Sequence, residues 1–426
     1  MKSLFLIAFS TIGLTIFGQP KNIKIYENNA MPIGVCEPSI IINPHNPANV
    51  IAGGILDFVF VSNDSGATWN MNTLKSESGV YGDPCLVADN KNHVYYLHLS
   101  DPEGKGWASE KLLDRIVVQR SDDGGENWSM DGYTGMNHPK DQDKQWACTD
   151  FNDQNVIVTW TEFDKYNSTD TIDKSNILFS RSEDLGKTFS EPIRVNQFSG
   201  DCLDDDLTTE GAVPAVGPNG EYYVAWSYNN KIYFDRSLDK GKTWLDKDAV
   251  VSEQPGGWTM DIPGIQRCNG MPITVSDISK GPFKGAVYVC WADKRNGDDN
   301  SDIFVSSSMD RGTTWSLPVR INDDSTNTQQ FFPWMSIDPI TGHLSVVFYD
   351  RRNHSDNNTD VYYAYSKDAG QTWVNEKISE SPFTPNKYVF FGDYNNISAY
   401  DGNVRPIWTR YEKGKLSIWT ALISIQ

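Results

Sequence analysis

Short stretches in which apolar and polar residues alternate recur along the chain, and this period of two predicts β-strands with one buried face. In the last full unit, residues 334–338, 343–349 and 360–365 form three such stretches separated by loops. A fourth stretch completes a unit, as residues 316–320 do in the preceding one. The pattern therefore predicts repeated groups of four short strands.

An octapeptide, Ser-x-Asp-x-Gly-x-x-Trp with Phe replacing Trp in one copy, separates the third and fourth predicted strands of a unit. It occurs six times, at residues 62–69, 121–128, 182–189, 237–244, 308–315 and 366–373. Successive aspartates of the octapeptide lie between 55 and 71 residues apart. Repetition at a nearly fixed period is typical of repeat folds. Four strands in each unit of about sixty residues indicate the blades of a β-propeller.

The octapeptide is best interpreted as the hairpin turn that joins two strands. In such a turn the Asp would accept backbone N–H bonds, the Gly would supply a positive φ and the aromatic residue would pack inward. The octapeptide is therefore structural, and we expect the chemistry of the protein elsewhere.

The count of blades follows from what remains after the six units. Those units end near residue 380, and residues 396–400, 404–410 and 416–422 form three more predicted strands. Residues 22–26 supply a fourth strand from the other end of the chain. We therefore predict an all-β fold, a seven-bladed β-propeller of four-stranded blades whose seventh blade is closed by the N-terminal strand. A closed ring has no free sheet edge, and we expect a monomer.

The N-terminus has the pattern of a secretory signal peptide, with a basic start, an apolar run over residues 4–17 and then small and polar residues. We expect residues 1–18 to be cleaved and residues 19–426 to form one propeller domain, secreted or periplasmic. The apolar run is short for a membrane span, and no later segment is apolar enough for one. A formal net charge of −19 argues against a nucleic-acid partner, since phosphates need a basic surface.

The octapeptides resemble the Asp-boxes of sialidases and related bacterial neuraminidase-type (BNR) repeat proteins. Other stretches are similar to those of exported bacterial sialidase-like proteins, namely residues 37–44, 291–297, 348–353 and 391–394. The resemblance implies a carbohydrate-active protein, in the first place an exo-glycosidase that hydrolyses terminal, acidic sugars from glycans. Asp-boxes also occur in lyases and in receptor ectodomains. A lyase acting on uronic-acid polysaccharides and a non-catalytic glycan- or protein-binding propeller therefore stay open.

The resemblance also implies a set of site residues. In sialidases three arginines hold the substrate carboxylate, a Tyr paired with a Glu is the nucleophile, and an Asp is the acid/base. The first of those arginines normally lies in an Arg-Ile-Pro motif before the first Asp-box. Here no arginine precedes Arg115, and residues 34–38 read Gly-Val-Cys-Glu-Pro. A sialidase-type site must therefore assemble its three arginines from other positions.

Ligands of propellers usually meet one end of the central channel, and several arginines fall in loops expected at that end. Arg295, Arg351 and Arg410 lie between second and third strands, and Arg267 lies before a first strand. These four are candidates for substrate binding, because arginine binds carboxylates through two parallel hydrogen bonds. The alternative is that they pair with neighbouring aspartates, and this interpretation is favoured for Arg352.

Acidic residues precede the first strands of several blades and are expected at the same end. Glu37 and Asp393 are candidates for substrate binding. The candidates for catalysis, by paired carboxylates or by a tyrosine nucleophile, are Asp83, Asp143, Glu210 and Tyr394. Taken singly, each carboxylate has an ordinary alternative role as a turn residue that accepts backbone N–H bonds.

Two further features bear on function. His98 and His138 fall in loops near lysines, which suits β-elimination from a uronic acid, although surface histidines are the favoured interpretation. The loop at residues 101–114 contains Trp107. This loop either folds over the mouth of the channel or is a plain surface insertion.

Metal and cofactor chemistry has weak support. The acidic loops at residues 201–206 and 298–302 would offer oxygen ligands to Ca²⁺, but neither has the spacing of an EF-hand. The six cysteines follow no metal-ligand spacing. We therefore expect no required cofactor and no metal site, with Ca²⁺ in the acidic loops as the minority alternative.

Overall fold

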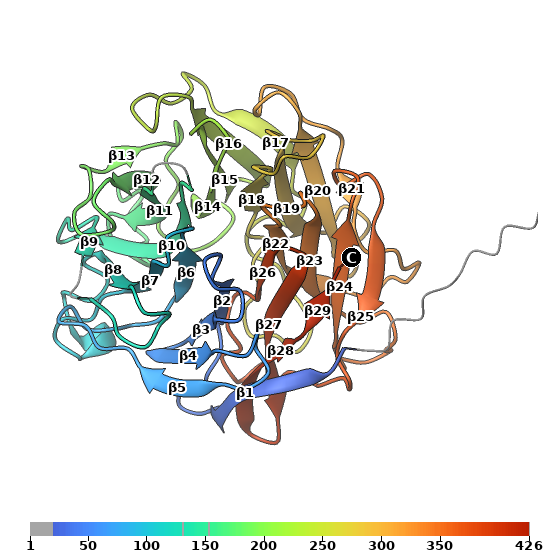
Figure 1. Ribbon diagram of the computed structural model, residues 1–426. Helices are drawn as coiled ribbons and strands as arrows, with labels where there is room; N and C mark the ends of the chain where they lie inside the picture. The colour runs from blue at the N-terminus through green and yellow to red at the C-terminus, as the bar shows by residue number, and fades with distance from the viewer. Residues whose placement is uncertain (1–19, 130–131, 152–153, 426) are drawn as a thin grey trace, which may run out of the picture.

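The computed structural model describes residues 20–129, 132–151 and 154–425, and the predicted signal peptide lies outside them. Seven antiparallel sheets surround a central channel like the blades of a propeller (Figure 1). The predicted fold class is confirmed. The described chain contains one short 3-10 helix, η1 (Gly106–Ala108), and no helix that could cross a membrane.

Each of the first six blades consists of four strands that follow one another along the chain, the innermost first. Blades 1 to 3 are formed by β2 (Ser39–Ile42), β3 (Val50–Gly54), β4 (Phe58–Ser62) and β5 (Asn70–Thr73); β6 (Cys85–Ala88), β7 (Val94–Leu99), β8 (Ile116–Ser121) and β9 (Gly132–Thr134); and β10 (Asp141–Thr149), β11 (Val156–Phe163), β12 (Ser175–Ser182) and β13 (Ile193–Arg194). Blades 4 to 6 are formed by β14 (Glu210–Val216), β15 (Tyr222–Tyr228), β16 (Lys231–Ser237) and β17 (Ala249–Glu253); β18 (Ile273–Ser276), β19 (Val287–Asp293), β20 (Asp302–Ser308) and β21 (Val319–Arg320); and β22 (Gln330–Ile337), β23 (Leu344–Asp350), β24 (Asp360–Ser366) and β25 (Val374–Lys377).

The seventh blade joins the two ends of the chain. It is formed by β26 (Asn396–Tyr400), β27 (Asn403–Glu412), β28 (Lys415–Ala421) and, outermost, β1 (Asn22–Asn29), with β29 (Ile423–Ser424) paired to β27. β1 (blue) lies beside β28 (red) in Figure 1, in antiparallel register from Asn22 opposite Ala421 to Asn29 opposite Lys415. This pairing confirms the predicted closure.

The six Asp-boxes form the turns between the third and fourth strands, and all six use the same hydrogen bonds. In the fifth box, Ser308 Oγ donates to Asp310 Oδ1 at 2.8 Å and accepts the N–H of Gly312 at 2.7 Å. The backbone N–H and the hydroxyl of Thr314 both donate to the Asp310 carboxylate and hold its pKa at about 2. The turns are therefore built from their own side chains, as predicted.

Neighbouring blades contact one another through the Asp-boxes. The Trp315 ring packs edge-on against Phe234 of the preceding blade, with 4.9 Å between ring centroids. Buried arginine side chains also reach across. Arg405 of the seventh blade donates to the Ser65 carbonyl of the first box at 2.7 Å. Aromatic packing and these hydrogen bonds join the blades into a continuous ring, including the junction where the chain ends meet.

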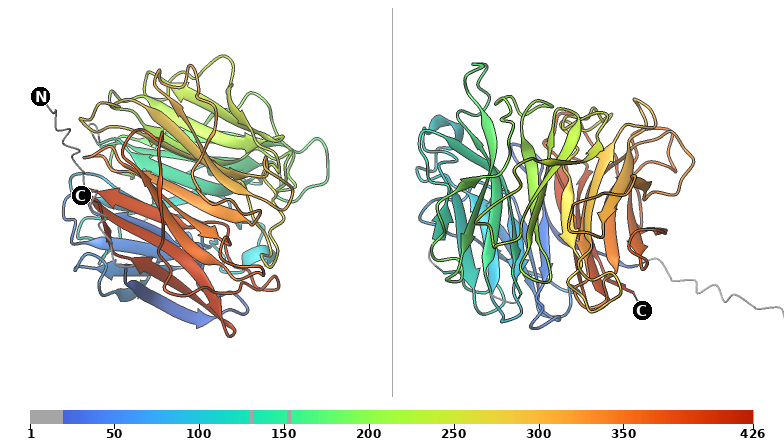
Figure 2. Two further views of the ribbon diagram at one scale, coloured as in Figure 1. Left: turned by 90° about the vertical axis from the view of Figure 1, so that its right-hand side faces the viewer. Right: turned by 90° about the horizontal axis from the view of Figure 1, so that it is seen from above.

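The innermost strands begin at one face of the disc, which we call the upper face, and the Asp-box turns lie at the opposite, lower face. Side views show the strands running between these two faces (Figure 2). The backbone kinks where several innermost strands begin: Glu37, Asp83, Lys144 and Phe332 have φ values of 50°, 49°, 50° and 49°. Non-glycine residues adopt this conformation rarely, and such strain is concentrated at functional sites.

Candidate active site

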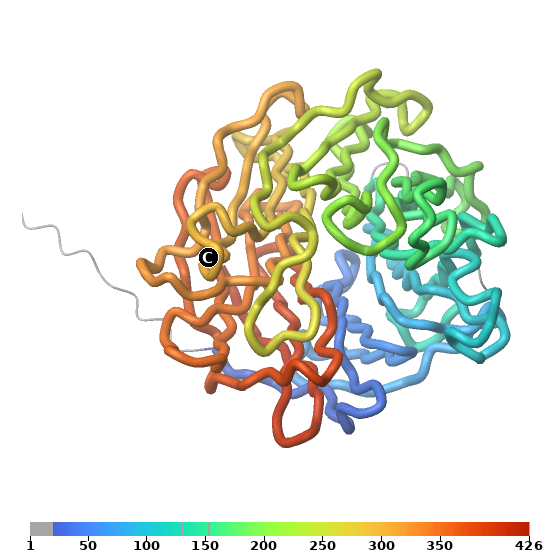
Figure 3. Tube along the Cα trace, turned by 180° about the vertical axis from the view of Figure 1, so that it is seen from behind, coloured from blue at the N-terminus to red at the C-terminus, as the bar shows by residue number. Residues whose placement is uncertain are grey.

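A cavity of 530 Å³ opens where the central channel meets the upper face. Its charged lining residues are Glu37, Asp83, Asp143, Lys144 and Arg267, and its aromatic ones are Tyr81, Trp107, Tyr166 and Phe390. The segment between β17 and β18, which carries Arg267, extends across this part of the molecule (yellow in Figure 3). Four of the ten predicted site residues thus line one cavity.

The kinks at the upper face explain this convergence. Glu37 and Asp83 each lie two residues before an innermost strand, and Asp143 and Lys144 lie within the β-bulge of β10. A bulge re-aims the side chains that it carries. Because the strands surround one axis, residues at equivalent positions in different blades point toward the same channel. The sequence pattern "acid before the first strand" therefore identified real neighbours.

An ion-pair network with Asp393 at its centre holds the two cations of the cavity. Lys144 Nζ lies 2.8 Å from Asp393 Oδ2 and 3.5 Å from Asp83 Oδ2. Arg267 Nε donates to Asp393 Oδ1 at 3.0 Å, and its Nη2 donates to Oδ2 of the same carboxylate. Burial alone would raise the pKa of Asp393, but Arg267 and Lys144 outweigh it and hold the pKa at about 2. Asp393 is therefore an anion that positions cations.

Asp143 behaves in the opposite way. Burial, which Lys144 opposes and the charges of Asp83 and Asp204 reinforce, raises the pKa of its carboxyl group to about 7. Burial and the Asp83 charge also raise the pKa of Glu37. The cavity therefore holds one carboxyl group, Asp143, that is poised to give up a proton near neutral pH, beside a second whose pKa is also raised.

Glu210 and Tyr394 lie behind the cavity wall. Glu210 is fully buried, and burial and the neighbouring Asp204 charge raise its pKa well above the usual range. Tyr394 is also buried, with its ring 4.9 Å from that of Trp146, and burial raises the pKa of its hydroxyl group. Neither side chain is among the described lining residues of the cavity.

The other three predicted arginines are bound elsewhere and do not line the cavity. Arg295 pairs with Asp293 and lies over the Phe304 ring, 4.4 Å from its centroid. Arg351 is 1% exposed and donates to the Pro263 carbonyl at 2.8 Å.

Arg410 donates to the Ser381 hydroxyl at 3.1 Å and lies over the Trp419 ring. Arg352, expected to be paired, lies 2.8 Å from the Asp350 carboxylate. The arginines named from their loops therefore include one that faces the cavity, Arg267, and three that brace the scaffold.

Asp204 belongs to the site, although the sequence analysis did not name it as a candidate site residue. Its Oδ2 accepts hydrogen bonds from Arg267 Nη1 at 2.9 Å and from the Tyr166 hydroxyl at 2.7 Å, and its Oδ1 accepts one from Trp258 Nε1 at 2.9 Å. The sequence signal for it is its place in the acidic loop 201–206, shortly before Glu210, which the sequence pattern alone indicates to be a solvated loop or a cation ligand.

Several other carboxylates of the acidic loops also have protein partners. Asp201 accepts from the Thr208 hydroxyl at 2.8 Å, and Asp206 accepts the N–H of Thr259 at 2.9 Å. In the second loop, Asp302 accepts from Asn322 at 2.6 Å. Within the described ranges no group of three or more His, Cys, Asp or Glu side chains is arranged to hold a metal ion. Ca²⁺ in these loops stays a prediction.

The loop at residues 101–114 folds over the mouth of the cavity rather than away from it. Trp107, on η1, is 65% exposed and lines the cavity. Its ring stacks on that of Tyr166, with centroids 5.5 Å apart, and meets the Tyr81 ring edge-on at 6.3 Å. His98, by contrast, is fully buried, with its Nδ1 2.8 Å from the Leu99 carbonyl oxygen.

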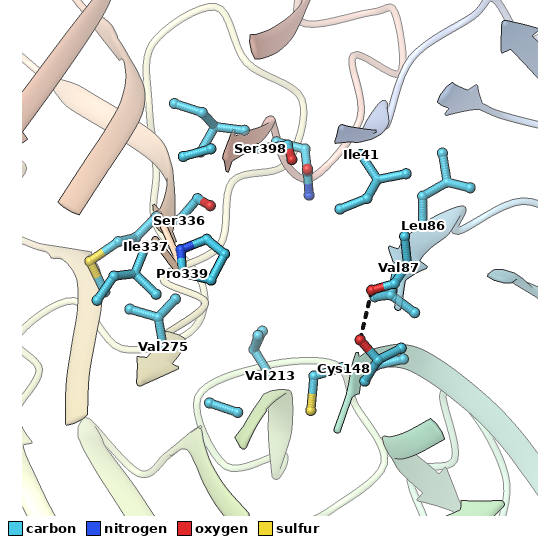
Figure 4. A pocket seen from close by; sticks show the side chains of 18 of the residues that line it. Ile41, Leu86, Val87, Cys148, Val213, Val275, Ser336, Ile337, Pro339 and Ser398 are labelled. Carbon is cyan, nitrogen blue, oxygen red and sulfur yellow. Dashed lines mark hydrogen bonds between the residues drawn. The ribbon is translucent and has the colours of Figure 1, made fainter. Parts of the chain in front are cut away.

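The lower end of the channel differs in chemistry. A second cavity of 240 Å³ there is lined by all seven innermost strands. Its labelled side chains in Figure 4 are mainly apolar, among them Ile41, Val87, Val275 and Ile337. Ionisable groups are thus gathered at the upper end, which is the candidate active site.

Comparison with known proteins supports the fold. The family model "BNR/Asp-box repeat" matches residues 119–130, and no curated protein matches the sequence. Among solved structures, an ulvan lyase of polysaccharide lyase family PL25, in complex with a glucuronic acid–rhamnose-3-sulfate unit, is 11% identical, with 95% of this chain and 96% of that chain covered and a TM-score of 0.56. A protein of unknown function from Dyadobacter fermentans is 10% identical, with coverages of 95% and 99% and a TM-score of 0.53.

The NanB sialidase from Streptococcus pneumoniae is 11% identical to this chain. The alignment covers 88% of this chain and 83% of the sialidase, with a TM-score of 0.51. Likeness at such low identity describes the fold and leaves the reaction open. Together with the repeat match and the seven blades, it shows that this chain has a β-propeller fold similar to that of the sialidase, with BNR/Asp-box repeats.

Proposed function

We propose that this protein is a glycoside hydrolase that removes a terminal sugar bound in the upper cavity. The observation that carries the proposal is the pair Asp143 and Asp83. Both line the cavity, and burial raises the pKa of Asp143 to about 7, where a carboxyl group serves as a general acid at neutral pH. With the predicted signal peptide, we further propose that the enzyme acts outside the cytoplasm.

The two carboxyl groups divide the reaction between them. Protonated Asp143 gives its proton to the glycosidic oxygen as the bond from that oxygen to the anomeric carbon breaks. Asp83, whose Oδ2 lies 3.5 Å from the Lys144 ammonium, takes a proton from water while the water oxygen bonds to the anomeric carbon. Attack by Asp83 itself, followed by hydrolysis of the glycosyl ester, would use the same two residues.

A tyrosine nucleophile of the sialidase type receives less support. Tyr394 is buried behind the cavity, and the burial that raises its pKa keeps it a neutral phenol. Elimination from a uronic acid is also less supported, because His98 is fully buried and burial raises the pKa of the cavity tyrosines Tyr81 and Tyr166, which disfavours either of them as the base. Hydrolysis by two carboxyl groups is therefore the function that the geometry supports best.

The test is turnover of a panel of 4-methylumbelliferyl glycosides by the wild type, Asp143→Asn and Asp83→Asn. We expect each variant to lose roughly 10²- to 10⁴-fold in kcat, the usual contribution of an acid/base group. Both should keep the melting temperature within a few degrees of the wild type. Arg295→Ala, which removes a side chain outside the cavity, is the control that retains turnover.

Other results have defined meanings. Glycan binding without turnover by the wild type would make the protein a binding module. New ultraviolet absorbance from an unsaturated product would make it a lyase. Unchanged turnover in Asp143→Asn would refute the assignment of the acid.

A further inference from the structure

We propose that the sugar bound in the upper cavity is uncharged, and that the site rejects sialic and uronic acids. The inference rests on the proposed function for the place where the sugar binds. It concerns the chemical class of the substrate, which the fold alone does not determine.

The first observation is that protein carboxylates already occupy both cations of the cavity. Arg267 donates hydrogen bonds from Nε and Nη2 to the Asp393 carboxylate and from Nη1 to the Asp204 carboxylate. Lys144, which is 5% exposed, lies between Asp393 at 2.8 Å and Asp83 at 3.5 Å. Arg267 is 40% exposed, but two buried carboxylates already neutralise its charge, and Lys144 is likewise paired, so a substrate carboxylate gains little attraction here unless it displaces one of these partners.

The second observation is the excess of acidic groups around the two cations. Even with Asp143 protonated, the carboxylates outnumber the cations Lys144 and Arg267. Asp83 faces the cavity, and Asp204 and Asp393 lie directly behind the cations. Arg351, Arg295 and Arg410, which would have offset this charge, are bound away from the cavity. An anionic sugar entering here meets like charge in a partly desolvated site, whereas sugar hydroxyl groups donate to carboxylate oxygens without that repulsion.

The third observation is the aromatic wall at the mouth. Trp107 is 65% exposed, and its ring is held in place by stacking on Tyr166 and by the edge contact with Tyr81. The face of an aromatic ring is electron-rich and attracts the weakly positive C–H face of a pyranose. Aromatic rings with a few placed polar groups are the usual lining of a pocket for an uncharged small molecule.

The test compares substrates that differ by one carboxylate. Wild-type enzyme is assayed on 4-methylumbelliferyl glucoside against glucuronide, galactoside against galacturonide, and on the N-acetylneuraminide. In parallel, the binding of Asp143→Asn to an array of neutral, uronic-acid-terminated and sialylated glycans is measured. We expect at least tenfold preference for the neutral member wherever turnover occurs, and array binding confined to glycans with uncharged ends.

Each outcome separates this inference from the proposed hydrolase. Turnover of the glucuronide, galacturonide or neuraminide in preference to the neutral sugars overturns the inference and leaves the hydrolase standing. Binding of neutral glycans without turnover keeps the inference and removes the hydrolase. Binding of charged glycans alone, or neither binding nor turnover, refutes the inference.

Two variants test the mechanism of rejection. Asp204→Asn frees Arg267 Nη1 from a charged partner, so relative binding of uronic-acid-terminated glycans should rise about tenfold.

Trp107→Ala should raise KM for a neutral substrate about tenfold with kcat retained, and Trp107→Phe should restore most of the loss. Leu317→Ala, which truncates an 86% exposed side chain far along the chain, is the matched control. An unchanged neutral-to-charged ratio in Asp204→Asn would contradict the role of the paired arginine.

Discussion

The ammonium group of Lys144 lies 2.8 Å from the carboxylate of Asp393, although 249 positions separate the two residues in the chain. Lys144 belongs to β10 of the third blade, and Asp393 precedes β26 of the seventh. Both side chains are almost fully buried. This ion pair therefore connects two blades across the central channel and at the same time fixes the position of a cation in the cavity.

Lys144→Met should destabilise the protein strongly. The variant removes one cation from the buried Asp393 and Asp83 carboxylates, and breaking a buried pair by deleting one partner costs about 3 to 5 kcal/mol. The free energy of unfolding from a denaturant titration measures the loss. Lys105→Met removes a surface lysine paired with Glu103, and because exposed ion pairs contribute little, its stability should stay close to that of the wild type. Equal stability of both variants would contradict a stabilising role for the buried pair of Lys144 and Asp393.

Turnover should fall as the pH rises through about 7, because protonated Asp143 is the proposed acid and burial raises its pKa to about that value. The same shift affects stability. A carboxyl group whose pKa is higher in the folded than in the unfolded protein stabilises the fold at low pH and loses that contribution as the pH rises through the folded value. The unfolding free energy should therefore descend between about pH 4, the usual pKa of an aspartate, and about pH 7, and level off above it, whereas kcat/KM should descend above about pH 7.

Asp143→Asn is the control for both descending limbs. Asn has no proton to lose, so the fall in stability between about pH 4 and pH 7 should weaken in the variant, and residual turnover should no longer fall above about pH 7. If the pH dependence of the wild type persists unchanged in Asp143→Asn, a titrating group other than Asp143 causes it.

Deleting residues 20–30 should cost much of the stability, because β1 closes the ring. β1 pairs along its length with β28, and Asn22 also donates to the Ile378 carbonyl of the sixth blade at 2.8 Å. Without β1, the backbone groups of β28 become an open sheet edge. We expect the melting temperature to fall by roughly 10 °C or more, since each kcal/mol shifts it by a few degrees.

Lys24→Ala keeps the β1 backbone and removes an exposed side chain, so it should melt like the wild type. An unaltered melting temperature in the deletion would show that the ring does not depend on this strand.

The fold could be predicted from the sequence because six of the seven blades contain the same Asp-box turn. The hydrogen bonds of each turn join residues within eight positions of one another, so a local sequence pattern is enough to identify the turn. Closure by residues 22–26 followed from counting strands. The acids at the cavity were found by the same local rule, because Glu37 and Asp83 stand at equivalent positions of two blades and Asp143 adjoins the equivalent position, Lys144, in the third.

The partners of those acids were harder to predict, because they come from different blades. Asp204 looked like one carboxylate of a solvated loop, and its contacts with Arg267 and Tyr166 span 63 and 38 positions. The role of three of the four arginines was hard to predict for a related reason. An arginine in an upper-face loop has its backbone near the cavity, but the direction of its long side chain depends on which carboxylates, carbonyls and rings lie nearby.

Arg351→Ala distinguishes a scaffold arginine from a substrate clamp. Arg351 is 1% exposed, lies over the Phe331 ring and donates to the Pro263 carbonyl and to the Thr359 hydroxyl. Truncation leaves these acceptors unpaired in the interior, and each such group costs about 1 to 3 kcal/mol. Denaturant unfolding should therefore show a loss of several kcal/mol, whereas KM of the folded enzyme should stay close to that of the wild type, because the side chain does not line the cavity. A variant with normal stability and a KM raised tenfold would instead place Arg351 on the substrate and reopen the arginine site of the sialidases.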